Sequence, residues 1–119
     1  MQFEDLQAWQ LSRLLVVNVY GLTRIEPLAQ DFGLKDQLQR AAVSVMTNIA
    51  EGFERIGAKE KLHFYNIARA SCGEVRSLLY VVEDVYPDLS EGACGTRNDS
   101  DRVGQVISGL IRSARKQPN

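Results

Sequence analysis

Residues 44–55 read "SVMTNIAEGFER", and the spacing in this stretch predicts a helix with two different faces. Val45, Ile49 and Phe53 recur at intervals of four, which is the period of a buried helix face. Ser44, Asn48 and Glu51 recur at intervals of four and three on another face of the same helix. The pattern continues toward the N-terminus and predicts a helix over residues 34–55.

The polar face of this helix forms a ridge on a wheel of about 100° per residue. It has three interpretations: a solvent-exposed face, a structural hydrogen-bond network against another helix or subunit, or a ligand-binding or catalytic site. Serine and asparagine are mediocre helix formers, so their use in consecutive turns favours the structural network. The predicted network, completed by two residues of the next helix, comprises Gln37, Arg40, Ser44, Asn48, Glu51, Ser71 and Glu74.

The rest of the chain shows helical periodicity and no convincing strand alternation. We expect helices over about residues 5–24, 34–55, 58–86 and 100–116, with Gly57 in the turn before the third and Pro87 after it. Residues 87–99 contain two glycines and are predicted to be a polar loop, with Asp99 or Ser100 capping the last helix. The fold class is therefore all-α: an antiparallel up-down-up-down four-helix bundle in one domain, residues 1–119.

The apolar residues of the second and third helices exceed what one buried stripe needs. The helix over 34–55 carries a second apolar set, Val43, Met46 and Ala50, and the helix over 58–86 is apolar around much of its circumference. A partner subunit is the simplest cover for such a surface, so the sequence predicts a homo-oligomer.

Charge gives no overall signal for nucleic acid, because the 119-residue chain has a net charge of −1. Two local groups of cations remain as candidate nucleic-acid contacts: Arg55, Lys59 and Lys61, and Arg112, Arg115 and Lys116. Each group alone is typical of an ordinary solvated surface, but an oligomer would repeat it and make multivalent phosphate contacts possible.

Catalytic and metal-binding patterns are missing from the sequence. His63 is the sole histidine, so the two Glu-x-x-His motifs that a di-metal bundle needs cannot both be present. Cys72 and Cys94 are interpreted as reduced thiols. No signal peptide or apolar run of membrane-spanning length is present. We therefore expect a cytoplasmic protein that is not an enzyme, with no metal, cofactor, small-molecule substrate or membrane partner.

Three segments together resemble a known family: "FEDLQAWQ" from Phe3, "GLKDQLQRAAVSVMTNIAEGFER" from Gly33 and "FYNIARASCGEVRSLL" from Phe64. They are similar to the four-helix bundle proteins encoded in intervening sequences of bacterial 23S rRNA genes. The resemblance implies a ring, a homopentamer, with no enzymatic activity. It also implies kinship with the accessory subunit of diversity-generating retroelements, a basic barrel that binds nucleic acid and a reverse transcriptase.

The chain departs from that family at Met46, where the family usually has proline, and at Gly57, where it often has serine. It also lacks the basic charge of the nucleic-acid-binding relatives. The expected function is therefore a ring-forming scaffold or adaptor in a nucleoprotein context. Direct RNA or DNA binding through repeated basic patches is the alternative.

Overall fold

Four long helices make up most of the computed structural model, which describes residues 1–118. They are α1 (Gln7–Thr23), α2 (Phe32–Glu54), α3 (Ala58–Val85) and α4 (Ser90–Arg115). Short 3-10 turns, η1 (Phe3–Asp5), η2 (Leu28–Gln30) and η3 (Pro87–Leu89), precede α1, α2 and α4, and no strand occurs among these residues. The all-α prediction is confirmed.

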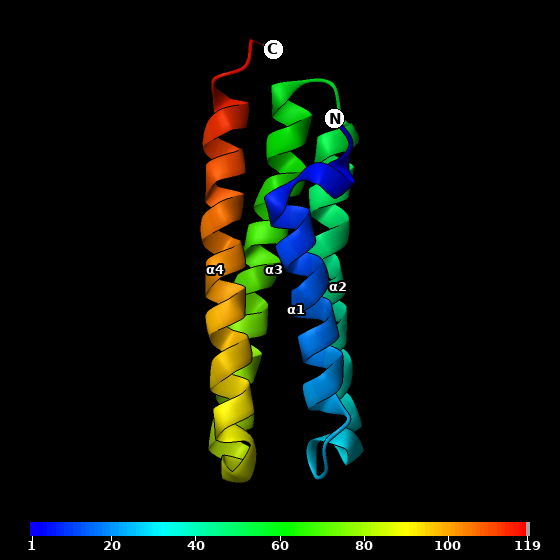
Figure 1. The fold of residues 1–119 in the computed structure, drawn as a ribbon, viewed down its shortest axis with the longest axis vertical. Coiled ribbons are helices and arrows are strands. Elements are labelled where there is room, and N and C mark those ends of the chain that lie inside the picture. Colours follow the sequence, from blue (N-terminus) through cyan, green and yellow to red (C-terminus); the bar gives the residue numbers. More distant parts are fainter. Residues whose placement is uncertain (119) are drawn as a thin grey trace.

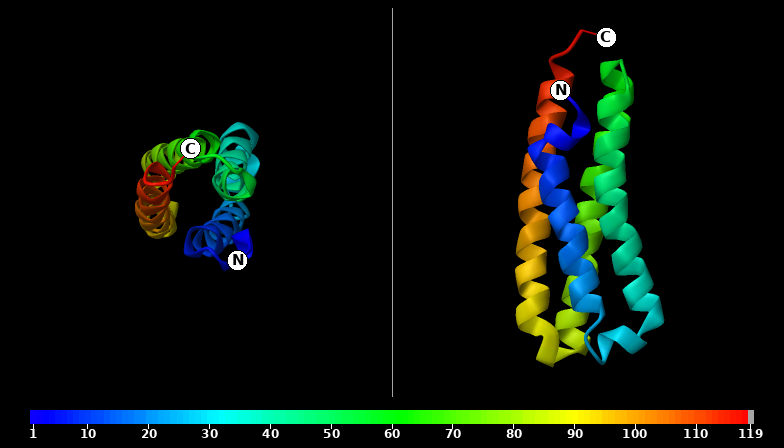
Figure 2. Two further views of the ribbon diagram at one scale, coloured as in Figure 1. Left: turned by 90° about the horizontal axis from the view of Figure 1, so that it is seen from above. Right: turned by 45° about the vertical axis from the view of Figure 1, so that its right-hand side comes forward.

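The helices stand side by side in a bundle of 49 × 21 × 17 Å, and successive helices run in opposite directions (Figure 1). Each packs against the next along the chain, and α1 packs against α4. Viewed along the bundle, α1 and α3 lie diagonally opposite each other (Figure 2). Among the described residues, none of the helices combines the length and apolar character that crossing a membrane requires.

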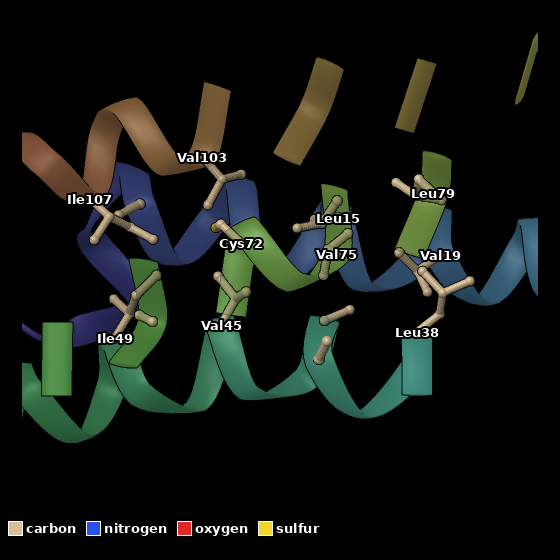
Figure 3. Packing of buried hydrophobic residues seen from close by; sticks show 14 of the residues in the cluster. Leu15, Val19, Leu38, Val45, Ile49, Cys72, Val75, Leu79, Val103 and Ile107 are labelled. Carbon is tan, nitrogen blue, oxygen red and sulfur yellow. The ribbon is translucent and has the colours of Figure 1, made fainter. Parts of the chain in front are cut away.

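The core runs along the centre of the bundle and draws on all four helices (Figure 3). The predicted core positions Leu38, Val45 and Ile49 of α2 are fully buried. They meet side chains from the other three helices, which include Leu15, Val19, Cys72, Val75, Leu79, Val103 and Ile107. Complete burial of branched aliphatic side chains provides the main driving force for this fold.

The last helix begins ten residues earlier than predicted, at Ser90 rather than at about residue 100. The glycines of the stretch 90–99 suggested a loop, but its small residues Ala93 and Thr96 are buried and extend the core face of α4. Ser100, predicted as a possible cap, is buried inside the helix and donates a hydrogen bond to the carbonyl oxygen of Cys72 at 3.0 Å. Tertiary packing here outweighs the low helix propensity of glycine, about 1 kcal/mol per residue.

The start of α2 is fixed by Asp31, which was not predicted from the sequence. Its Oδ1 accepts the Leu34 amide at 3.2 Å, and its Oδ2 accepts the Tyr86 hydroxyl at 2.7 Å. Asp31 thus caps α2 at Phe32, two residues before the predicted start, and also ties it to the end of α3.

The end of α2 packs very closely on α3. A Cβ atom added at Gly52 would lie 2.6 Å from Cε1 of the buried Tyr65. The Lys61 Nζ donates to the carbonyl oxygens of Gly52 and Phe53 at 3.3 and 2.8 Å. The Gly52 carbonyl also accepts the Arg55 amide at 3.2 Å. The last carbonyls of a helix lack i+4 amide partners, so Lys61 stabilises the end of α2.

Candidate functional site

Three residues of the predicted polar network meet between α2 and α3. The hydroxyl oxygens of Ser44 and Ser71 lie 2.9 Å apart. The Asn48 Nδ2 donates to the Ser44 carbonyl oxygen at 2.8 Å and to its Oγ at 3.1 Å. Ser71 is buried, and Ser44 and Asn48 are half-buried. The three side chains therefore form one continuous hydrogen-bonded link between the two helices.

The other four residues of the predicted network do not join this link. Arg40 forms an exposed ion pair with Asp36 at 2.8 Å, and Glu51 forms one with Arg55 at 2.9 Å. Gln37 and Glu74 are exposed, and neither side chain forms a hydrogen bond or ion pair with another residue of the range 1–118. The ridge thus divides into a half-buried link and a charged solvent-exposed edge.

We expect the serine pair to contribute measurably to stability. Ser71→Ala leaves the Ser44 hydroxyl without its partner on α3, so the free energy of unfolding should fall by about 1 kcal/mol. Urea unfolding followed by circular dichroism measures this change. The control Ser77→Ala alters an exposed serine of the same helix and should have little effect. Equal stabilities for the two variants would contradict a structural role for the pair.

The six candidate cations gather at one end of the bundle, where the α2–α3 connection and the C-terminal end of α4 lie (Figure 1). Two of them have structural partners: Lys61 binds carbonyl groups of α2, and the Arg55 guanidinium pairs with Glu51 and lies 4.8 Å from the centre of the Phe64 ring. The others are exposed and form no salt bridge within residues 1–118: Lys59, Arg112, Arg115 and Lys116.

The residues considered for catalysis remain apart. The Glu51 carboxylate is paired with Arg55 at 2.9 Å. His63 is exposed and packs edge-on against Phe64, with ring centres 4.9 Å apart. No group of three potential metal ligands is assembled among residues 1–118. No feature of this region positively indicates catalysis.

An ion pair between α3 and α4 is not predictable from a sequence pattern that places residues 90–99 in a loop. Arg97 forms a bidentate pair with Glu83 at 3.1 and 3.2 Å, which raises the pKa of its guanidinium. The same guanidinium lies 4.2 Å from the centre of the Tyr80 ring and donates to the Cys94 Sγ at 3.4 Å. With the helix extended, Cys94 and Arg97 are one turn apart and face a matching turn of α3.

Exposed apolar side chains form two surfaces on opposite sides of the bundle. The first, here named the α1 face, consists of Leu14, Val17 and Gly21 of α1 and Ile25 just after its end, and Val17 is 61% exposed. The second, the α3 stripe, consists of the exposed Ile67, Val81 and Val85 together with the half-buried Leu78, and Val85 is 55% exposed. The α3 stripe agrees with the apolar excess predicted for the helix over 58–86.

The α1 face was not predicted; the sequence placed a second exposed apolar surface on the helix over 34–55 instead. Of the second apolar set predicted on the helix over 34–55, only Val43 is exposed, at 37%, while Met46 and Ala50 are half-buried. The sequence of α1 did not predict more apolar residues than one buried face needs. The uncovered surface therefore lies on α1 and α3.

The chain is similar to known proteins in both sequence and fold. The family model described as "23S rRNA-intervening sequence protein" matches residues 4–109. A solved structure from Bacteroides thetaiotaomicron VPI-5482, described as a protein with unknown function from the S23 ribosomal protein family, is similar with a TM-score of 0.81. The two are 18% identical, and the similarity covers 88% of this chain and 95% of that one, which establishes a shared fold. A search of curated proteins gives no match.

Proposed function

Because the chain belongs to the family of 23S rRNA-intervening sequence proteins, we propose that it is a self-assembling scaffold or adaptor of the cytoplasm. In this proposal it acts in a nucleoprotein context, without catalysis or a cofactor. The observation that carries the proposal is the presence of two exposed apolar surfaces, the α1 face and the α3 stripe, on diagonally opposite helices.

Two separate surfaces favour a ring over a simple dimer. Exposed valine and leucine gain about 25 cal/mol for each Å² that a partner covers, so both surfaces favour association. A twofold contact between like surfaces would cover one of them and leave the other in water. A contact between unlike surfaces adds one copy after another, and the copies form a closed ring when the rotation between neighbours divides a full turn evenly. The ring size that we propose is a pentamer.

The remaining outer faces are polar and suit a partner of another kind. The outer side of α2 carries exposed Thr47 and Glu54 and the Asp36–Arg40 pair. The outer side of α4 carries exposed Asn98, Gln105 and Arg112. In a ring joined through α1 and α3, these two faces stay available, and each is repeated once per copy.

The mass in solution tests this proposal. Light scattering coupled to size exclusion at micromolar concentration should give about 67 kDa, five times the 13.3 kDa of one chain. Burial of apolar surface does not depend on ion pairing, so the mass should persist at 0.5 M salt, where charge interactions are screened within about 4–5 Å. A mass of 13.3 kDa in both buffers would overturn the proposal.

Direct binding of RNA or DNA is a second candidate function. It is favoured by the four exposed cations that share one end of the bundle, Lys59, Arg112, Arg115 and Lys116. A ring would repeat them around one rim, and phosphate contacts gain strongly from such repetition at low salt.

A mobility-shift series separates the two functions. If the protein binds RNA or DNA directly, it should shift single-stranded RNA or duplex DNA probes at 50 mM salt. The shifted fraction of the probe should then fall steeply as the salt concentration rises. Lys59→Gln/Arg112→Gln should weaken this shift, while Arg24→Gln/Arg40→Gln, which removes two exposed charges nearer the other end, should not. No shift at 50 mM salt would eliminate direct binding and leave the scaffold proposal standing.

A further inference from the structure

The α1 face borders a groove between α1 and α4 that is open to solvent. This groove has a volume of about 600 Å³, and its lining includes Val17, Gly21 and Ile25 on one side and Gly92 and Gly95 on the other. A Cβ atom at Gly21 or Gly95 would have no neighbour within 4 Å, so none of residues 1–118 fills the space next to these two glycines. An apolar ridge of a helix from another molecule can enter such a groove closely.

The α3 stripe lies at the same height along the bundle as this groove. Asn18 of α1 donates to Asp99 of α4, and Asp101 and Arg97 on either side of Asp99 pair with Arg76 and Glu83 of α3. Asn18 is therefore level with the middle of the segment 76–83. Since α1 and α3 run in the same direction with the same rise per residue, a residue of α1 is level with the residue about 60 positions later in α3.

This register aligns the two apolar surfaces along their length. Gly21 is level with Val81 to within one helical turn. Ile25 follows the end of α1 at Thr23, so the register is not extended to it. A closed ring is generated by rotation alone, with no translation along its axis. Neighbouring bundles that stand parallel to that axis therefore meet at equal heights, as these two surfaces require.

Exposed charges that have no ion pair within residues 1–118 lie beside both surfaces: Glu74 beside the α3 stripe, and Arg102 and Asp99 beside the groove, where the Asp99 carboxylate accepts a hydrogen bond from Asn18. Glu74 lies on the side of α3 that carries the stripe, and Arg102 lines a small hollow with Leu14, Asn18 and Asp99 at the upper end of the groove. Glu74 is level with Leu14 by the same register, so it is also level with Arg102. Contact between two copies of the α3 stripe about a twofold axis parallel to the helices would instead oppose one Glu74 to another.

We propose that the α3 stripe of one copy occupies the α1–α4 groove of the next copy, with Glu74 paired to Arg102 across the contact. This inference rests on the proposed self-assembly and specifies its interface. The occupant of the groove is a second copy of this chain. The contact is head-to-tail, so each copy uses both surfaces.

Mixing two blocked variants tests the arrangement. Val17→Glu blocks the α1 face and Val81→Glu blocks the α3 stripe, while each variant keeps the other surface intact. Each alone should be a monomer of 13.3 kDa, and an equimolar mixture should form a one-to-one pair of about 27 kDa, twice that mass. The control Ile56→Glu, at a residue 94% exposed outside both surfaces, should keep the wild-type mass.

A charge reversal provides an independent measurement. Glu74→Arg and Arg102→Glu should each raise the concentration at which the assembly dissociates about tenfold or more, and the double variant should restore most of it. A monomeric wild-type protein would overturn both proposals. A wild-type oligomer whose blocked variants keep their mass, or fail to pair when mixed, would overturn this interface and leave self-assembly intact.

Discussion

Gly52→Ala is expected to lower the free energy of unfolding by about 2 kcal/mol, although alanine favours a helix more than glycine does. The new methyl carbon would lie 2.6 and 2.7 Å from two ring carbons of Tyr65 and 3.3 Å from the Lys61 carbonyl oxygen. Tyr65 is buried, so its ring has little room to move aside, and α2 and α3 must separate to relieve the overlap. Urea unfolding at constant protein concentration measures the loss.

Gly73 offers a matched control for this substitution. It lies within α3, and a Cβ atom added there would meet nothing within 4 Å. Gly73→Ala should therefore raise stability by about 0.5–1 kcal/mol through the lower conformational entropy of the unfolded chain. Opposite signs at the two positions would identify close packing as the cause. A stable Gly52→Ala variant would show instead that the Tyr65 ring shifts freely.

Stability should also fall at alkaline pH because of Cys72. Burial raises the pKa of this thiol from its ordinary value of 9.0 to about 11, against smaller opposing effects of Ser100 and Arg76. The unfolded chain releases the proton near pH 9, whereas the folded chain keeps it until about pH 11. The contribution is complete below pH 9 and declines as the pH rises to about 11, by about 2–3 kcal/mol for a shift of this size.

The comparison with Cys72→Ala isolates this effect. Burial raises the pKa of Tyr65 in the same direction, so the wild-type curve alone contains more than one group. The variant is less stable at every pH because of the cavity that it creates, but its stability should decline less between pH 9 and 11. Urea unfolding at pH 8, 9.5 and 10.5 gives the two slopes. Parallel curves would contradict the role assigned to the Cys72 thiol.

Sequence patterns located the helices wherever strong start and stop signals flank them. Gly57 and Pro87 bracket the third helix, and its observed range Ala58–Val85 differs from the predicted one by one residue. The fourth helix lacked such a signal, because its first ten residues are small or polar and face the core through Ala93 and Thr96. Only the neighbouring helices make these residues a helix, and periodicity of large apolar residues does not detect them.

Only part of the candidate site was predictable, because side chains of different length find different partners. The wheel position of Ser44 and Asn48 predicted a link toward another helix. Ser44 forms this link with Ser71 of α3, and Asn48 supports it by donating to Ser44 within α2. The longer side chains of Arg40 and Glu51 reach along the helix surface and pair within α2. The binding of Lys61 to the end of α2 depends on the geometry of the α2–α3 turn, which composition does not reveal.

The order in which the helices pack has a kinetic consequence. Three of the four extensive helix pairs join neighbours in the chain, and only the pair α1–α4 joins distant segments. Such a low contact order is typical of helical bundles that fold in microseconds to milliseconds. The α1–α4 groove exists only once this distant pair has closed. An assembly that uses the groove must therefore follow monomer folding as a slower, concentration-dependent step, and newly made chains would spend that interval as folded monomers.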